Sequence, residues 1–132
     1  MTPLLQSTHT ATLVSYHLWR REIHIFQVMA SGDYPLYSCR NCRNPLAFYS
    51  DLISTSFKAK SGQAYMFSHV INVVLGKKED RHMITGLYTI ADIYCSNCGE
   101  ELGWKYVMSY DIKQRYKEGN FIVEKLKILE EN

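Results

Sequence analysis

The sequence predicts a mainly β domain whose parts are held together by a metal ion. Runs of β-branched and aromatic residues recur from Tyr34 onward, and ten tyrosines in 132 residues favour strands with half-buried surfaces. All four cysteines fall in two Cys-x-x-Cys pairs, Cys39/Cys42 and Cys95/Cys98, with 52 residues between the pairs. The first observation predicts the fold class, and the second predicts what joins its halves.

The elements of this β domain follow from local patterns, taken in chain order. Apolar or alternating runs predict strands over residues 36–38, 64–67, 70–75, 87–94, 102–108 and 121–128, with a further strand starting at His82. The charged segment 76–80 is expected to form a turn. A short helix is predicted over residues 111–118, with Asp111 as its N-cap and Gly119 as its stop.

Residues 1–33 differ from the rest and are predicted to be a poorly ordered N-terminal extension of a domain over residues 34–132. The first 19 residues are rich in Thr and Ser, have no acidic side chain and are followed by Arg20 and Arg21. Organelle transit peptides share this pattern. A poorly ordered extension is the preferred interpretation, because chain ends commonly lack order.

Composition argues against several classes of protein. The formal net charge is only +2, so electrostatics does not predict nucleic-acid binding. No apolar run approaches the ~20 residues that span a bilayer, so no membrane association is expected. Charged residues at 20–22 interrupt the only apolar stretch near the start, which argues against a secretory signal. An intracellular, reducing location is therefore expected.

The paired cysteines are interpreted as the ligands of one structural Zn²⁺. Two residues between thiolates let one tight turn aim both sulfurs at a single ion, and two such turns complete a tetrahedron. Asn44-Pro45 after the first pair and Gly99 after the second suit such turns. With every coordination position filled by sulfur, none stays open for a substrate, so catalytic zinc is not expected.

Two other chemistries use the same motif. A Cys-x-x-Cys pair can be a redox centre, but it then normally opens the helix of a βαβ unit, and the pattern here predicts no such unit. Two disulfides would need an oxidising compartment, which the lack of a secretory signal does not support. Structural zinc is the preferred interpretation.

The residues around and between the cysteine pairs resemble the yippee family of eukaryotes. The resemblance extends from about Tyr37 to Asn132. Besides the cysteines, it depends on Gly62, Asn72, Gly86, the block Gly103-Trp104-Lys105-Tyr106, Lys117 and Glu124. The chain departs from the family's usual Leu, Asn and His at Met66, Ser68 and Tyr88, and residues 1–33 are longer than the family's usual start.

This resemblance implies a β-tent, in which two antiparallel sheets meet at an angle and are tied by a zinc site with four cysteine ligands, with one short C-terminal helix. The ligand-binding domain of cereblon, methionine sulfoxide reductase B, a centromere-priming protein and the RNA-end-sensing domain of an innate immune helicase share the architecture. Because these proteins do unrelated things, the fold alone does not give the function.

The sequence offers no candidate catalytic set. A methionine sulfoxide reductase of this fold needs a nucleophilic cysteine besides the metal ligands, and this chain has no fifth cysteine. The five histidines have no ligand-like spacing. We therefore expect a non-enzymatic protein-interaction adaptor. The resemblance implies a link to ubiquitin-ligase or nuclear regulatory complexes, in the nucleus and/or the cytoplasm.

An aromatic pocket is the alternative candidate site. Trp104 and Tyr106 are two positions apart on a predicted strand and so face the same way, and a similar stretch of cereblon forms part of its aromatic cage. Phe67, Tyr88 and Tyr94 are further candidates. Such a pocket would read a small ligand or a modified peptide; packing of Trp104 in the core is the competing interpretation. RNA binding ranks third, because the basic residues are too few.

Overall fold

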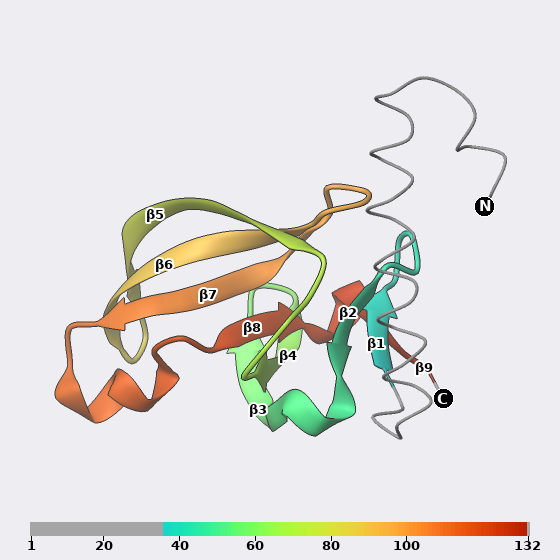
Figure 1. Cartoon of the computed structure of the whole chain (residues 1–132). Coiled ribbons are helices and arrows are strands. Elements are labelled where there is room, and N and C mark those ends of the chain that lie inside the picture. Colours follow the sequence, from blue (N-terminus) through green and yellow to red (C-terminus); the bar gives the residue numbers. More distant parts are fainter. Residues whose placement is uncertain (1–35, 132) are drawn as a thin grey trace, which may run out of the picture. The chain divides into compact units, whose positions relative to one another are not determined.

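The computed structural model describes residues 36–131, so the prediction for residues 1–33 lies outside the described part of the chain. Within residues 36–131, nine strands and three short 3-10 helices follow one another (Figure 1). They are β1 (Leu36–Cys39), β2 (Pro45–Phe48), η2 (Tyr49–Asp51), β3 (Leu52–Ala59), β4 (Gly62–Phe67), β5 (Val73–Met83), β6 (Gly86–Cys95), β7 (Glu101–Ser109), η3 (Ile112–Lys117), β8 (Phe121–Glu124), η4 (Lys125–Lys127) and β9 (Ile128–Glu131). The prediction of a mainly β fold is confirmed. None of the helices in this span is long and apolar enough to cross a bilayer.

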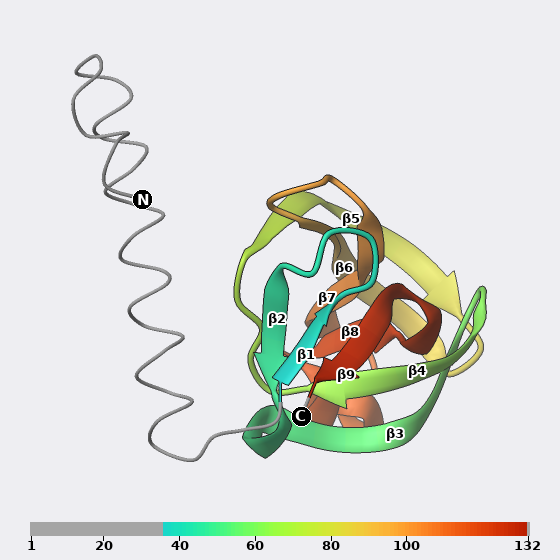
Figure 2. The same cartoon turned by 90° about the vertical axis from the view of Figure 1, so that its right-hand side faces the viewer.

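The strands form two antiparallel sheets, as expected. The small sheet has the order β2-β1-β9, and the large sheet has the order β3-β4-β8-β7-β6-β5 (Figures 1 and 2). The chain leaves the large sheet after β8 and enters the small sheet at β9, with η4 between them. The single strand predicted over residues 121–128 is therefore wrong, because the chain has to break its extended run to change sheets.

The charged turn predicted over residues 76–80 is also wrong. These residues belong to β5, with a bulge between Leu75 and Lys78 where the pairing with β6 shifts. Because β5 is an edge strand of the large sheet, it carries charged side chains toward water without leaving the sheet. Farther along β5, the Arg81 guanidinium is also paired, since it contacts the Asp92 carboxylate of the neighbouring strand at 3.2 Å.

The hairpin that joins β5 to β6 turns later than expected. Residues 84 and 85 form the turn, and Gly86 follows with a φ of 142°, a backbone conformation that glycine tolerates. The strand predicted to start at His82 is thus the end of β5. The sequence pattern also gave no sign of β2 or of β3, whose burial does not alternate cleanly.

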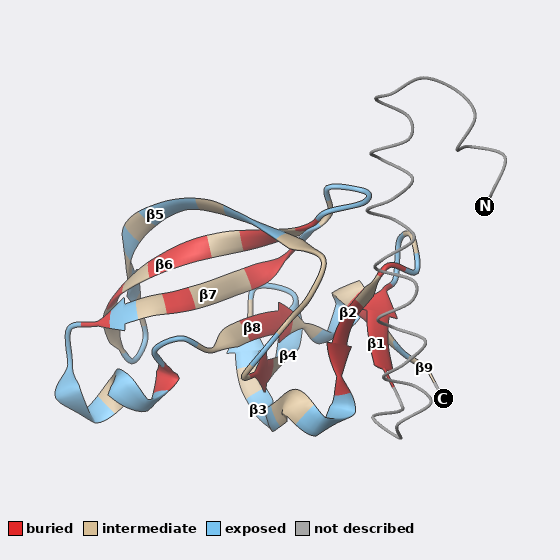
Figure 3. Cartoon of the chain, viewed as in Figure 1, coloured by how far each residue is buried: buried red, intermediate tan, exposed pale blue. Residues whose placement is uncertain are grey.

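The short helix near the C-terminal end is present as the 3-10 helix η3. Asp111 caps it by accepting a hydrogen bond from the Lys113 backbone N–H at 2.9 Å, and Gly119 follows in the left-handed region with a φ of 83°. The predicted cap and stop are thus found. Burial along the chain is uneven: β1 and β2 are mostly buried, β6 and β7 alternate between buried and more exposed residues, β3 has no buried residue, and η3 is mostly exposed (Figure 3).

Two hydrophobic clusters lie in the described part of the chain. The first, which we name the intersheet core, joins the small sheet to the large one; it comprises Tyr37, Cys39, Leu46, Ala47, Phe67, Ile93, Cys95, Leu102, Val123 and Ile128. The second, the pocket-side core, is built by the large sheet alone; it comprises Ala64, Met66, Tyr88, Ile90, Tyr106 and Ile122.

The two cores lie on opposite faces of the large sheet. Adjacent residues of β4, Met66 and Phe67, belong to different cores, and so do Ile122 and Val123 of β8. Since successive side chains of a strand point to opposite faces, these strands are covered on both sides. The large sheet therefore carries one face toward the metal ligands and the other toward Tyr88, Trp104 and Tyr106.

Candidate metal centre and aromatic pocket

Each cysteine pair lies in the turn of a hairpin, β1–β2 for the first and β6–β7 for the second, and the two turns share one hydrogen-bond pattern. In each turn, the backbone N–H of the first cysteine donates to the carbonyl of the residue five positions later. The backbone N–H of the residue four positions after that cysteine donates to the cysteine's own carbonyl. The bonds are Cys39 N–H to Asn44 O (2.8 Å), Arg43 N–H to Cys39 O (2.7 Å), Cys95 N–H to Glu100 O (2.9 Å) and Gly99 N–H to Cys95 O (2.9 Å).

The residue after the second cysteine is left-handed in both turns. Gly99 has a φ of 80°, which agrees with the role expected from the sequence, whereas Arg43 takes the equivalent position with a φ of 67°. The Arg43 guanidinium contacts the Glu131 carboxylate of β9 at 3.1 Å. That contact links the first turn to the last strand of the small sheet.

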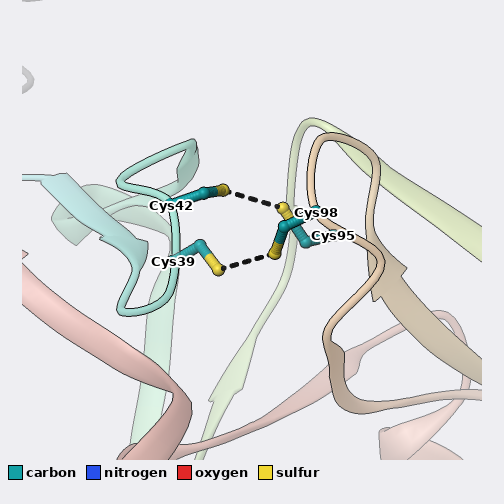
Figure 4. A group of neighbouring side chains, drawn as sticks. All are labelled: Cys39, Cys42, Cys95 and Cys98. Carbon is teal, nitrogen blue, oxygen red and sulfur yellow. Dashed lines mark hydrogen bonds between the residues drawn. The ribbon is translucent and has the colours of Figure 1, made fainter.

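The structure brings all four predicted cysteines together. Their Sγ atoms lie within 4.8 Å of one another, with Cys39 facing Cys98 at 3.7 Å and Cys42 facing Cys95 at 3.5 Å (Figure 4). A disulfide needs about 2.05 Å between sulfurs, so these distances do not describe disulfides. Tetrahedral thiolates about 2.3 Å from a Zn²⁺ ion are about 3.8 Å apart, which fits the observed spacing.

The protein surroundings favour the ionised, metal-binding form of some of these thiols. Burial is the largest influence on Cys95 and raises its pKa, but hydrogen bonds from the Cys98 backbone N–H and the Asn44 side chain outweigh it and help lower the pKa to about 6. The Asn41 side chain is the main cause of the lowered pKa of Cys98. Burial raises the pKa of Cys39, which faces Cys98, to about 12. Thiolates stabilised by N–H donors are the ligands that zinc prefers.

A second set of contacts joins the two turns directly. The Asn44 side chain donates to Cys95 Sγ at 3.3 Å, and the Asn72 carbonyl accepts from the Ser96 backbone N–H at 2.9 Å. The Asn72 side chain in turn donates to the Pro45 carbonyl at 2.7 Å, from a left-handed backbone with a φ of 59°. Sequence reasoning placed Asn72 only in the family pattern and gave it no role; its position between the turns could not be read from its neighbours.

Because the first turn belongs to the small sheet and the second to the large sheet, one ion at this centre would tie the two sheets. The C-terminal segment adds protein contacts between the same parts. The Arg40 backbone N–H donates to the Lys127 carbonyl at 2.9 Å, and Lys127 Nζ contacts the Glu100 carboxylate at 2.6 Å. The residues present therefore fit a structural ion, with ligands drawn from both sheets.

The predicted aromatic residues do not all meet. Trp104 and Tyr106 of β7 line an open pocket of about 850 Å³ together with Phe57, Tyr116 and Lys117. Their rings meet edge to face with centroids 6.0 Å apart. The competing interpretation of Trp104 as a core residue is partly right, since its ring also packs against the pocket-side core.

Tyr88, Phe67 and Tyr94 do not line this pocket. Tyr88 is fully buried beneath it, with its ring centroid 4.9 Å from that of Tyr106. Phe67 lies in the intersheet core, 5.3 Å from the Tyr37 ring, because its strand alternates and Met66 takes the pocket face. Tyr94 is half-buried on β6, beside Gly76 of the edge strand.

Two polar groups of the pocket lining have unusual surroundings. The Nε1–H of Trp104 is buried and makes no hydrogen bond with any described residue, although it lies close enough to the Tyr106 hydroxyl to lower the pKa of that group. Burial is the larger influence and raises the pKa of Tyr106 to about 12. Lys117 is only 3% exposed. Sequence reasoning missed Lys117 as a site residue, and its place in the family pattern was the only available signal.

Taken together, the fold and the site define a small β domain that carries a four-cysteine metal centre. A family model described as "Yippee zinc-binding/DNA-binding /Mis18, centromere assembly" matches residues 36–130. The crystal structure of the Mis18 "Yippee-like" domain superposes with a TM-score of 0.59, covers 74% of this chain and 94% of that chain, and is 13% identical. This likeness shows the shared fold.

Relatives in sequence identify the family. A yippee-like protein of Arabidopsis thaliana is 60% identical over 99 residues, which are 75% of this chain and 94% of the relative. Protein yippee-like 3 of Danio rerio is 46% identical over 107 residues, which are 81% of this chain and 90% of the relative. The chain belongs to the yippee family, as the resemblance of its sequence predicted.

Proposed function

We propose that this chain is a non-enzymatic zinc-binding module that acts as a protein-interaction adaptor. The observation that carries the proposal is the cluster of four cysteine sulfurs from two sheets. If all four hold one Zn²⁺, sulfur fills every coordination position and none stays open for a water or a substrate. A closed site of this kind supplies structure, and the function then lies on the surface that it holds in place.

The ion itself has a direct test. We expect elemental analysis of the purified chain to give one zinc per chain, and the family description as zinc-binding supports that expectation. A chain that is folded and cooperative while it holds no metal would contradict the proposal. A chain that prefers iron under the same conditions would keep the site and change the ion.

The adaptor function is supported by apolar side chains that the described surface leaves uncovered. Ile84, at the tip of the β5–β6 hairpin, is fully exposed, and Ile53 and Tyr116 are more than half exposed. All three line the rim of the pocket, and Ile112 lies on the same helix as Tyr116. Apolar residues gathered in this way favour contact with another protein.

For the setting, we propose ubiquitin-ligase or nuclear regulatory complexes in the nucleus and/or the cytoplasm. The family resemblance supports the first, and the words "centromere assembly" in the family description support the second. The same description names DNA binding, for which the charge of this chain gives no support. The net charge of +2 is small, and Arg81 is already engaged by Glu79 and Asp92.

Affinity capture with mass spectrometry tests the adaptor function when the variants are matched. We expect Ile84→Asp to lose a specific set of partners, because it places a charge on the exposed apolar rim. Leu126→Asp is the control, because Leu126 is also apolar and exposed but lies on η4, away from the pocket. Equal partner sets for Ile84→Asp and the native chain would contradict this choice of surface.

A pocket that reads a small ligand or a modified peptide is the second candidate function. The pocket lined by Trp104 and Tyr106 supports it, with a volume of about 850 Å³ and a buried indole N–H that makes no well-formed hydrogen bond with residues 36–131. Trp104→Ala in the same capture experiment separates the two functions. A reader loses its partners with Trp104→Ala, whereas an adaptor that uses only the rim keeps them, provided that circular dichroism shows a folded variant.

A further inference from the structure

Lys117 is a buried cation without a buried anion. Its Nζ donates to the Tyr88 hydroxyl at 2.9 Å and to Thr85 Oγ1 at 3.1 Å. It also lies 5.1–5.8 Å from the centroids of four aromatic rings, those of Phe57, Tyr88, Tyr106 and Tyr116. Among residues 36–131, no carboxylate oxygen lies within 4.0 Å of the Lys117 ammonium; the ion pairs found there are made by other cations.

This arrangement leaves the ammonium group incompletely compensated. Lysine is rarely this buried unless it is paired with a carboxylate, because loss of hydration is expensive. Ring faces replace part of the hydration through cation–π attraction, and two hydroxyl oxygens replace two water molecules. An ammonium has three N–H donors, so one donor of Lys117 has no acceptor within the described residues.

The same pocket holds a second, incompletely satisfied donor and no negative charge. The buried Nε1–H of Trp104 makes no well-formed hydrogen bond with the described residues, although the Tyr106 hydroxyl lies near it, and both Trp104 and Lys117 line the pocket. The described lining also includes Lys58 and contains neither Asp nor Glu. A cavity with aromatic walls, donors without acceptors and positive charge attracts an anion that carries an apolar group.

We propose that this pocket binds a carboxylate carried on an aromatic or other apolar group, with Lys117 as the residue that recognises the anion. The proposal rests on the pocket's being a reader site, the second candidate function above. A carboxylate fits better than a phosphate, because phosphate sites usually combine several backbone N–H groups or arginines, whereas one lysine and one indole N–H match a single charge. The apolar group would lie against Phe57, Trp104 and Tyr116.

Two sources supply this chemistry. One is a free small organic acid, and the other is the C-terminal residue of a peptide chain. The exposed Ile53 and Ile84 on the rim would contact the preceding residues of a peptide but not a small acid. The volume of about 850 Å³ is large enough for either source.

The test is an NMR titration of the ¹⁵N-labelled, zinc-loaded full chain. The indole N–H signal of Trp104 is the readout, and because the chain has only two tryptophans, Trp19→Phe assigns it. The probes are phenylacetate, N-acetyl-phenylalanine and a pentapeptide that ends in phenylalanine. Each is compared with the neutral amide in which the carboxylate is replaced by a carboxamide. The amides keep the apolar group and remove the charge.

We expect the acids to shift the Trp104 indole signal saturably and the amides to bind at least tenfold more weakly. Lys117→Met should weaken binding of the acids at least tenfold and leave the amides unchanged. Lys113→Met is the matched control, since it removes an exposed lysine of the same helix, and it should bind like the native chain. A pentapeptide acid that binds more tightly than N-acetyl-phenylalanine assigns the site to peptide termini, and equal affinity assigns it to small acids.

Three results would overturn the proposal. If acids and amides bind equally well, the pocket is a reader but Lys117 does not select an anion. If Lys117→Met is folded and binds the acids like the native chain, the recognition residue is wrong. If no probe moves the indole signal at millimolar concentration, both the anion site and the reader function fail, while the adaptor function is untouched. The acid-to-amide comparison in the native chain decides the outcome even if Lys117→Met does not fold.

Discussion

The metal centre and the aromatic pocket lie on opposite faces of one sheet, and they treat buried polar groups differently. At the metal centre, the side chains of Asn44 and Asn72 donate to Cys95 Sγ and to the Pro45 carbonyl. At the pocket, by contrast, the Trp104 Nε1–H makes no well-formed hydrogen bond and Lys117 has no carboxylate partner among the described residues.

This difference indicates what each region is for. Buried polar groups that are satisfied stabilise a fold, whereas buried donors left without acceptors lower its stability and persist where a ligand supplies the acceptor. The metal centre is therefore expected to carry the stability of the domain, and the pocket is expected to carry little of it. Changes at the metal centre should therefore cost the most stability, and changes at the pocket the least.

Loss of the metal centre should unfold the domain. Structural zinc contributes about 10–16 kcal/mol of apparent binding free energy in small peptides, against a net stability of about 5–15 kcal/mol for a typical domain. We expect Cys95→Ser, or removal of the metal from the native chain by a strong chelator, to abolish cooperative thermal unfolding measured by circular dichroism. Asn97→Ala, an exposed change in the same turn, should unfold like the native chain. A soluble Cys95→Ser chain with native unfolding would break the comparison at its first step.

The second prediction concerns the contact between the two regions. Gly103 lies on β7 between Leu102 of the intersheet core and Trp104 of the pocket. A Cβ at this position would come 1.9 Å from the Ile122 carbonyl oxygen, so β7 and β8 would have to move apart. We expect Gly103→Ala to lower the free energy of unfolding by at least about 3 kcal/mol.

Gly119→Ala is the matched control for this change. Gly119 also has a positive φ, 83°, but a Cβ there meets nothing within 4 Å, so only backbone strain of roughly 1–2 kcal/mol is expected. Urea unfolding of both variants gives the comparison. Similar losses for the two glycines would show that β7 and β8 have room to separate, and that the two faces of the sheet are less tightly coupled than the distance implies.

The parts of the molecule that the sequence predicted correctly depend on local patterns. Residues 87–94 and 102–108 alternate strongly and are strands, and Asp111 caps a short helix as its neighbours indicated. The cysteine cluster was also predictable, because the Cys-x-x-Cys spacing is itself a local geometric constraint. In each case the signal lies within a few residues of the feature.

What the sequence could not predict depends on contacts between distant residues. Residues 76–80 look like a charged turn, and only their place on an edge strand makes them part of β5. Lysine is typical of a surface, so nothing near Lys117 in the sequence indicates burial beside Tyr88, which is 29 positions away. For the same reason Phe67 could not be separated from the pocket residues before the faces of β4 were known.

Alkaline pH should weaken both regions by a similar amount. Burial raises the pKa of Tyr37, in the intersheet core, and of Tyr106, beside the pocket, to about 12. Both tyrosines stay neutral in the folded chain up to about pH 12, whereas tyrosines of the unfolded chain ionise near pH 10. Between these pH values the unfolded state binds fewer protons than the folded state, so the free energy of unfolding falls as the pH rises from about 10 toward 12. We expect a loss on the order of 2 kcal/mol for each tyrosine, measured by urea unfolding. Tyr37→Phe and Tyr106→Phe should each remove about half of it; if only Tyr37→Phe does, water already reaches Tyr106 through the pocket.

Lys117 provides the most sensitive test, because its predicted effect on stability is the smallest. Methionine matches the stem of lysine, removes a charge that has no carboxylate partner, and leaves the Thr85 and Tyr88 hydroxyls hydrogen-bonded to each other. The variant loses the hydrogen bonds and cation–π contacts of Lys117. This loss is offset because folding no longer has to remove water from a buried ammonium group. We therefore expect Lys117→Met to lie within about 1.5 kcal/mol of the native chain in urea unfolding, in either direction. A loss as large as that of Gly103→Ala would mean that Lys117 joins η3 to the sheet as a structural contact, and the division between a stabilising metal face and a ligand-binding pocket face would no longer hold.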